Sequence, residues 1–211
     1  MLMKYKKYLS TTLILFLISC TSTQNSNNKL YELIISAEGG DINAQNEVAQ
    51  AYYFGKMLER NELEGCKWAI KYAQNKESNN QTTIMLAGMC HKFGKLGNKD
   101  YFEAAKFLKK SASLGNPIAN HEISSFYTQG LAGEQDSLKA FKHMLFAAQS
   151  GLDKSQYWIA IFYLNGFGTY KNESKAFCWF EAASIQGNKE AKKNFKSMLQ
   201  RPPYDNYQLV N

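Results

Sequence analysis

The sequence contains little proline: three residues among 211, two of them adjacent near the C-terminus. It also has few long runs of β-branched residues, whereas alanine, leucine, lysine and tyrosine are abundant. This composition favours helices over a β-sandwich. Hydrophobic residues make up 45% of the chain and aromatic residues 14%, which excludes a wholly disordered protein.

The chain also lacks a strong excess of one charge. It has 25 basic and 18 acidic residues, a formal net charge of +7. Lys4, Lys6 and Lys7 lie in a segment that we expect to be removed, which lowers the net charge by three, to +4. Nucleic-acid binding usually requires a clustered basic face, so we expect no nucleic-acid partner.

Residues that commonly carry chemistry are scarce. The three histidines, His91, His121 and His143, have no zinc-motif spacing and no accompanying acidic cluster. Ser26 and Lys29 match the SxxK pattern of penicillin-reactive enzymes, but nothing around them would hold the serine or lower the pKa of the lysine. No phosphate-binding glycine motif is present. The sequence therefore predicts no catalytic residue, no metal site and no cofactor.

The N-terminus has the features of an export signal. Residues 1–7 carry three lysines and no acid, and an apolar run follows over residues 9–18. Such a run is too short to cross a bilayer core, which needs roughly 20 residues, but it has the size of a signal-peptide core. Residues 17–20, Leu-Ile-Ser-Cys, resemble a bacterial lipobox. The resemblance implies that residues 1–19 are removed and that Cys20 is lipidated; the alternative is an ordinary signal peptide with a chance cysteine.

The residues after Cys20 bear on location. Thr21, rather than aspartate, resembles the sorting signal of lipoproteins sent to the outer membrane. Two or three acyl chains would anchor the protein stably where a single chain would not. The polar residues that follow, up to residue 28, predict a flexible tether. We therefore expect a protein of the bacterial cell envelope, anchored in the outer membrane and facing the periplasm.

Four blocks of similar pattern begin at residues 44, 83, 119 and 155. In each, a small residue is followed by an apolar and a small residue, then by a ring and a glycine at fixed spacing. The rings are Tyr52, His91, Tyr127 and Tyr163, and the glycines are Gly55, Gly94, Gly130 and Gly166. The conserved spacing places the small, apolar and ring positions on one side of a helix, and the glycine where a helix C-terminus needs a left-handed residue. Each block is thus predicted to open with an amphipathic helix.

A second helix is predicted in each block. Six residues after each glycine stands a side chain that can accept hydrogen bonds from free amides at a helix start, namely Asn61, Asp100, Asp136 and Asn172. Small residues then recur around a bulky ring position, which holds Trp68, Phe107, His143 and Trp179. Because His91 and His143 occupy ring positions, we expect them to pack rather than to bind a ligand. Each block is a predicted helix pair brought together by small residues.

Half-repeats flank the four blocks. Residues 30–40 have the pattern of a lone second helix, and residues 188–200 that of a lone first helix. Such half-repeats would cap a stack, as the ends of a solenoid require. The tail over residues 201–211 contains Pro202 and Pro203, which would end the last helix. It either packs back on the last block or remains free.

The block pattern resembles the Sel-one-like repeat, a relative of the tetratricopeptide repeat. The last block matches it best, through Ala160, Tyr163, Gly166, Gly168, Asn172, Lys175, Ala176, Trp179 and Gly187. The departures are Ala87 and His91 in place of leucine and tyrosine, Gly65 in place of alanine, and a loop lengthened by three residues around residues 77–80. For residues 29–200 the resemblance implies an all-α, right-handed α-solenoid of about four helix-pair repeats with half-repeat caps.

Three cysteines remain besides Cys20. Cys66 and Cys90 each lie roughly twelve residues from the centre of the turn at residues 76–81, so antiparallel flanking helices would bring them side by side. The alternatives are a disulfide, if the geometry allows it, or two buried thiols. Cys178 aligns with lysines in the other blocks, which predicts an exposed site with a free thiol or an intermolecular bond.

A partner-binding stripe is predicted on the first helices, opposite their core positions. Offsets of two, six and nine residues from each block start lie there and carry more methionine, tyrosine and aliphatic side chains than a plain surface needs. The residues selected are Tyr53, Met85, Met89, His121, Tyr157, Ile161 and Leu164. The alternative is that a misjudged helix rotation makes this stripe part of the core between repeats.

The family resemblance implies a scaffold without enzymatic activity that binds another envelope or secreted protein. A sharper version is a periplasmic immunity protein that blocks a toxin. The alternative is a β-lactam-binding or peptidoglycan-acting enzyme, which would require a nucleophile or an acid pair that the sequence does not display. Disulfide-rich relatives described as binding penicillins carry cysteines where this chain has Ala112 and Asn120, which disfavours that alternative.

Overall fold

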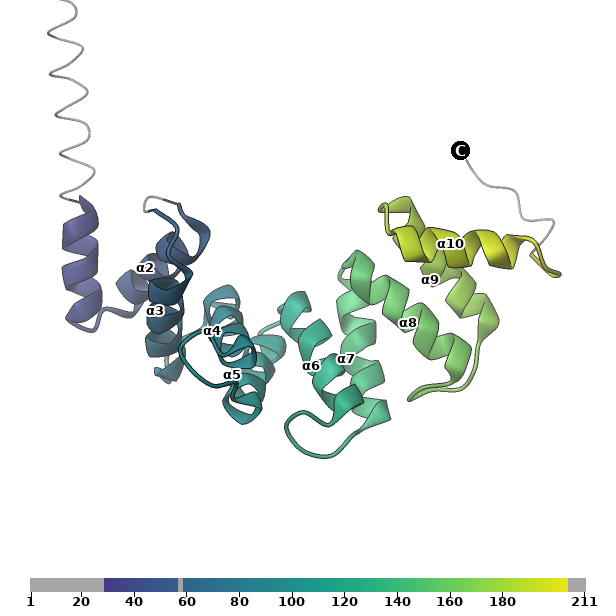
Figure 1. Ribbon diagram of the computed structural model, residues 1–211, viewed down its shortest axis with the longest axis horizontal. Coiled ribbons are helices and arrows are strands. Elements are labelled where there is room, and N and C mark those ends of the chain that lie inside the picture. Colours follow the sequence, from purple (N-terminus) through teal and green to yellow (C-terminus); the bar gives the residue numbers. More distant parts are fainter. Residues whose placement is uncertain (1–28, 57–58, 205–211) are drawn as a thin grey trace, which may run out of the picture. The chain divides into compact units, whose positions relative to one another are not determined.

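The computed structural model describes residues 29–56 and 59–204, and all regular structure within them is helical (Figure 1). The predicted signal peptide, the predicted lipidation site at Cys20 and its tether, and residues 205–211 of the tail lie outside the described residues. The described residues divide into two compact units, with the boundary between residues 75 and 76. Among the helices of the described part, none combines the length and the apolar character needed to span a bilayer.

Unit 1 contains a helix over residues 29–38, then α2 (Ile42–Phe54) and α3 (Glu62–Gln74). Ala37 of the first helix forms a small core with Ala44 and Val48 of α2. Gln45 ties the same two helices together, because its Nε2 donates to the Ala37 carbonyl at 3.1 Å. The lone helix predicted before the first block is therefore confirmed.

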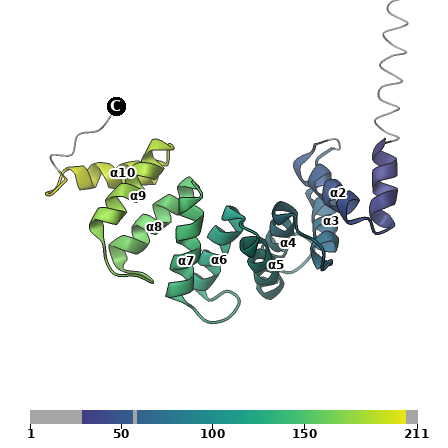
Figure 2. The same ribbon diagram turned by 180° about the vertical axis from the view of Figure 1, so that it is seen from behind.

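Unit 2 continues the alternation of first and second helices. Its helices are α4 (Gln81–Phe93), α5 (Tyr101–Ser113), α6 (Pro117–Gln129), α7 (Ser137–Gln149), α8 (Asp153–Asn165), α9 (Glu173–Ile185) and α10 (Lys189–Leu199). Within this unit the two helices of each block pack together, and α5, α7 and α9 each also contact the first helix that follows (Figure 2). This confirms the all-α architecture of helix pairs, with α10 as the half-repeat at the end.

The helix ends follow from local sequence. Asp100 Oδ1 accepts a hydrogen bond from the Glu103 amide at 2.9 Å, and Asn172 Oδ1 accepts one from the Lys175 amide at 2.8 Å. The four predicted C-terminal glycines have φ values from 65° to 71°. Only a residue without Cβ adopts this backbone freely, so these glycines stop each first helix at the same place.

Gly65 has a different role, because it allows two helices to approach closely. A Cβ added at this position of α3 would lie 2.7 Å from the backbone nitrogen of Tyr53 in α2. The second, third and fourth blocks carry Ala104, Ala140 and Ala176 at the equivalent position. At this point α2 and α3 therefore lie closer together than an alanine at the same position would allow.

The start of the C-terminal tail packs back on the last block. The Tyr204 ring stacks on Phe177 of α9, with the ring centroids 4.3 Å apart and an angle of 10° between the planes. Arg201 forms an ion pair with Glu173 at 3.3 Å. Of the two alternatives for the tail, residues 201–204 follow the packed one.

Candidate protein-binding site

The predicted partner-binding stripe is less exposed than the sequence suggested. The expectation that Met85 faces solvent is wrong, because only 7% of it is exposed. Tyr157, Ile161 and Leu164 are half-buried and pack against the core formed by α7 to α10. The physical reason for these three residues is that α8 contacts both α7 and α9, which buries a wider arc of α8 than its pairing with α9 alone. Tyr53 and Met89, also in the stripe, are likewise half-buried.

An open pocket of about 150 Å³ lies on this side of unit 2, between α6 and α8. His121, from the predicted stripe, lines it together with other residues of α6. The opposite wall comes from Trp158 and Phe162, each one position after the predicted Tyr157 and Ile161. The full lining, called the α6–α8 pocket below, is His121, Ser125, Thr128, Gln129, Met144, Trp158 and Phe162.

Trp158 is the functional candidate that the sequence prediction missed. Its side chain is 45% exposed, although it belongs to a helix whose neighbouring residues are mostly buried. The equivalent residues of the other blocks are Glu47, Leu86 and Glu122. A tryptophan at a position held elsewhere by glutamate or leucine was the available signal, because tryptophan is enriched at the energetic centres of protein interfaces.

His121 joins the two walls of the pocket. Its Nδ1 lies 2.8 Å from the hydroxyl of Ser155, which is fully buried in α8. Burial is the largest influence on this imidazole and lowers the pKa of His121, while the nearby Glu122 carboxylate acts in the opposite direction. The ring is therefore neutral at pH 7. Within the described residues its other nitrogen, Nε2, has no hydrogen-bond partner.

The remaining polar groups of the pocket are partly occupied. Thr128 Oγ1 donates to the Ser124 carbonyl at 2.9 Å, so its proton is used within α6. Gln129 Nε2 donates to Ser125 Oγ at 2.7 Å, which leaves the Ser125 hydroxyl proton for another acceptor. The pocket thus combines aromatic walls with a small number of uncharged hydrogen-bonding groups.

The preceding junction, between α4 and α6, shows why the pocket opens where it does. The residues equivalent to Thr128 and Trp158 are Lys92 and Glu122, whose side chains form an ion pair and are only 20% and 15% exposed. At the α6–α8 junction threonine and tryptophan replace this pair. The shorter threonine and the aromatic ring leave an uncharged opening in place of an ion pair.

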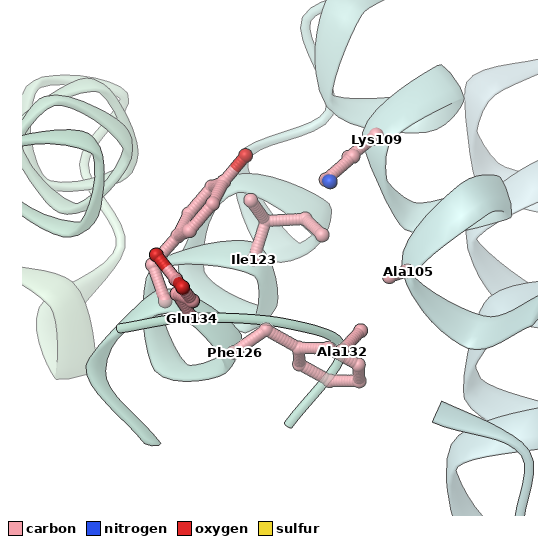
Figure 3. Close-up of a pocket in the computed structure, with 7 residues that line it drawn as sticks. Ala105, Lys109, Ile123, Phe126, Ala132 and Glu134 are labelled. Carbon is pink, nitrogen blue, oxygen red and sulfur yellow. The ribbon is translucent and has the colours of Figure 1, made fainter. Parts of the chain in front are cut away.

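A second pocket lies between α5, α6 and the loop after α6 (Figure 3). Its volume is only about 20 Å³, close to what a single water molecule needs. Ile123 and Phe126 line it, and the side chains of Lys109 and Glu134 lie at its sides (Figure 3). It is too small to receive a partner side chain.

The other two histidines have packing roles, as their ring positions predicted. His91 stacks on Phe107 with the ring centroids 5.7 Å apart, and His143 stacks on Tyr127 at 5.8 Å. His143 Nδ1 also lies 2.8 Å from the side-chain oxygen of Asn120. Within residues 29–56 and 59–204, no group of three or more His, Cys, Asp or Glu side chains is arranged to hold a metal ion.

The three cysteines of the described region differ in exposure. Cys66 in α3 and Cys90 in α4 are buried, at 0% and 3% exposure, and belong to different units. Their pairing stays a prediction. Cys178 in α9 is an exposed free thiol, which confirms its predicted exposure.

Comparison with known proteins accounts for the repeated architecture. The Sel1 repeat matches four times, at residues 42–76, 83–116, 117–152 and 153–188. A search of the curated proteins found no match. A solved structure of a protective antigen present in uropathogenic Escherichia coli strains, displaying an SLR fold, is 28% identical with a TM-score of 0.72. That match covers 82% of this chain but only 37% of the antigen's chain.

A Sel1 repeat protein from Oxalobacter formigenes is 26% identical, with a TM-score of 0.67 over 82% of this chain and 67% of its own. The four repeat matches together cover more than half of the sequence, and their limits coincide with the helix pairs of the structure. This chain belongs to the Sel1 repeat family.

Proposed function

We propose that this protein is a non-enzymatic scaffold that binds another envelope or secreted protein through the α6–α8 pocket and the surface around it. Sel1 repeat proteins generally act as scaffolds for protein–protein interaction, and the fold is typically non-enzymatic. The observation that carries the choice of surface is the exposed ring of Trp158 beside an open pocket of about 150 Å³. Tryptophan beside a well-formed pocket is typical of interface hot spots.

Site-specific photo-crosslinking tests this surface. A photoreactive phenylalanine analogue at Gln129, an exposed residue of the pocket, is expected to give a discrete crosslinked product in cells. The same analogue at Phe146, which is 42% exposed on α7, serves as the matched control. The product should disappear when Trp158→Ala is added to the Gln129 variant. A product that forms equally at both positions, or at Phe146 alone, would place the partner elsewhere.

We also propose that the protein is a lipoprotein of the outer membrane, anchored through Cys20 and facing the periplasm. The support is the sequence of residues 1–21, with its basic start, short apolar run, lipobox-like end and Thr21. Metabolic labelling with an alkynyl fatty acid is expected to mark the full-length chain but not Cys20→Ser. Thr21→Asp should keep the label and move the protein to the inner membrane. Labelling that persists in Cys20→Ser would contradict the assignment.

Within this proposal, the sharper role is that of a periplasmic immunity protein. An outer-membrane anchor would hold the α6–α8 pocket where toxins from competing cells arrive. A strain that lacks the protein is expected to lose survival in competition with a toxin-producing neighbour. Wild-type protein should restore survival and Trp158→Ala should not, whereas Phe146→Ala should behave as wild type. Equal survival with and without the protein would refute the immunity role. The proposal of a protein-binding scaffold would still be decided by the crosslinking test.

A further inference from the structure

We infer that the α6–α8 pocket receives an uncharged aromatic side chain with a hydroxyl group, that of a tyrosine, from a protein partner. This inference rests on the proposed function, because it names the chemistry of the group that the partner inserts. It goes further in predicting which residue of the partner carries the specificity.

The size of the pocket admits one ring. A protein cavity of about 150 Å³ holds a benzene molecule, and the α6–α8 pocket has this volume. A helix or a peptide backbone does not fit into such a space, so the occupant is a single side chain whose backbone remains outside.

The walls favour an aromatic occupant. Trp158 and Phe162 present two rings from α8, and Met144 contributes a thioether that is almost fully buried. An additional ring between such groups gains offset or edge-to-face contacts worth about 0.5–1.5 kcal/mol beyond burial of its area. The sulfur of Met144 adds a favourable contact with the edge of a ring.

The electrostatics of the pocket disfavour a charged occupant. The pKa of His121 is lowered, mainly by burial, so the only titratable side chain in the lining is neutral at pH 7. Glu122 is already neutralised by Lys92. Asp153 and Lys154 at the start of α8 act on the imidazole with opposite signs. A carboxylate or ammonium group would therefore lose its hydration without gaining a counter-ion.

The uncharged polar groups favour a hydroxyl over a plain ring. His121 Nε2 has no partner within the described residues, and the Ser125 hydroxyl proton is not used in its bond with Gln129. A phenol can donate to one group and accept from the other. A plain phenyl ring would leave both groups unpaired, so we expect it to bind about three- to tenfold more weakly.

Fluorine NMR tests the inference directly. The chain has three tryptophans, Trp68, Trp158 and Trp179, so protein labelled with 5-fluorotryptophan gives three signals. p-Cresol, the side-chain analogue of tyrosine, is expected to shift the Trp158 signal at millimolar concentration and to leave the other two in place. The Trp158→Phe variant identifies the signal. Toluene should shift it with an affinity three- to tenfold lower, and 4-methylbenzoate should not shift it.

Two variants and a control complete the test. Ser125→Leu fills the pocket and should weaken p-cresol binding at least tenfold. His121→Phe should abolish the preference for p-cresol over toluene. Ile185→Ser, on the 80% exposed residue at the end of α9, should change nothing. Far-UV circular dichroism confirms that each variant is folded.

The inference is overturned if p-cresol leaves the Trp158 signal unmoved, if 4-methylbenzoate binds as well, or if Ser125→Leu binds p-cresol as tightly as wild type. The result is separable from that of the crosslinking test. A crosslinked partner without a p-cresol response removes the tyrosine inference and keeps the scaffold. A p-cresol response without a crosslinked partner keeps the chemistry of the pocket and removes its proposed use.

Discussion

Replacing Gly65 by alanine tests whether the close approach of α2 and α3 is essential to unit 1. In an ordinary helix interior this change is stabilising, because alanine has a helix propensity about 1 kcal/mol better than that of glycine. At Gly65, however, the new Cβ would lie 2.7 Å from the Tyr53 nitrogen and 2.8 Å from its Cα. These are backbone atoms, so no side-chain rotation relieves the contact, and the two helices must move apart.

The expected magnitude follows from these two opposing effects. Overpacking a tight contact by one methyl group costs typically 1–3 kcal/mol, and a backbone neighbour places Gly65 near the middle of that range. After subtraction of the gain in propensity of about 1 kcal/mol, the free energy of unfolding of unit 1 should fall by about 1 kcal/mol. Ala140→Gly, the reverse change at the equivalent place in α7, should also destabilise, because there glycine loses propensity and relieves no contact.

Hydrogen exchange is the suitable assay, since it resolves the two units. Amides of α3 should lose protection by roughly fivefold in Gly65→Ala, which corresponds to about 1 kcal/mol. Amides of α9 should be unchanged. An increase in the protection of α3 would show that unit 1 accommodates the methyl group without cost and would refute the packing argument.

The remaining predictions concern charge, protonation and oxidation. Lys92→Met should lower the free energy of unfolding by about 1–3 kcal/mol in a urea titration, because it leaves the half-buried Glu122 carboxylate unpaired. Adding Glu122→Leu should recover most of this loss. A double variant as unstable as Lys92→Met would contradict the argument. Burial lowers the pKa of both His121 and His143, so the unfolded chain binds more protons than the folded one below the ordinary histidine pKa of about 6.5. The stabilisation from these two histidines should therefore be fully present above pH 6.5 and decline as the pH falls towards about 5. A urea midpoint that rises on acidification would contradict this sign. Replacing both His121 and His143 by glutamine should make the dependence of stability on pH flatter. If Cys66 and Cys90 are bridged, a Cys20→Ser variant from an oxidising compartment, unfolded in urea, should show one titratable thiol before reduction and two more after it. Three thiols without reductant would exclude the bridge.

The helix pairs could be predicted from sequence because their signals are local. Asn172 caps α9 through an amide three residues away, and Gly166 ends α8 through its own backbone angle. Neither interaction depends on the rest of the fold. Because the pattern occurs four times, each capping residue and each terminal glycine could be recognised in several blocks. All four predicted N-terminal caps of the second helices form.

The pocket could not be predicted in the same way, because it depends on the rotation of one helix against another repeat. The stripe was placed by angle within a single helix, which put Tyr157 rather than Trp158 on the open side. A difference of one residue rotates a helix position by about 100°, since a turn contains 3.6 residues. Met85 was also placed on the open side by its angle alone, yet only 7% of it is exposed. The opening of the pocket also requires two replacements at once. Thr128 and Trp158 stand where the junction of α4 and α6 has the ion pair Lys92–Glu122.

The connections between repeats have a consequence for how the chain folds. The hydrogen bond that joins Asn188 to Asp153 links residues 35 positions apart, and the bond between His121 and Ser155 links residues 34 apart. Stabilising contacts of this kind reach only to the adjacent repeat, so the loops that must close are short and folding is expected to be fast. A chain that folds this readily gains structure as soon as two neighbouring repeats are available. Under the proposed export to the envelope, transport across a membrane in an extended form would have to compete with folding. Factors that delay folding would then have a direct effect on the yield of exported protein.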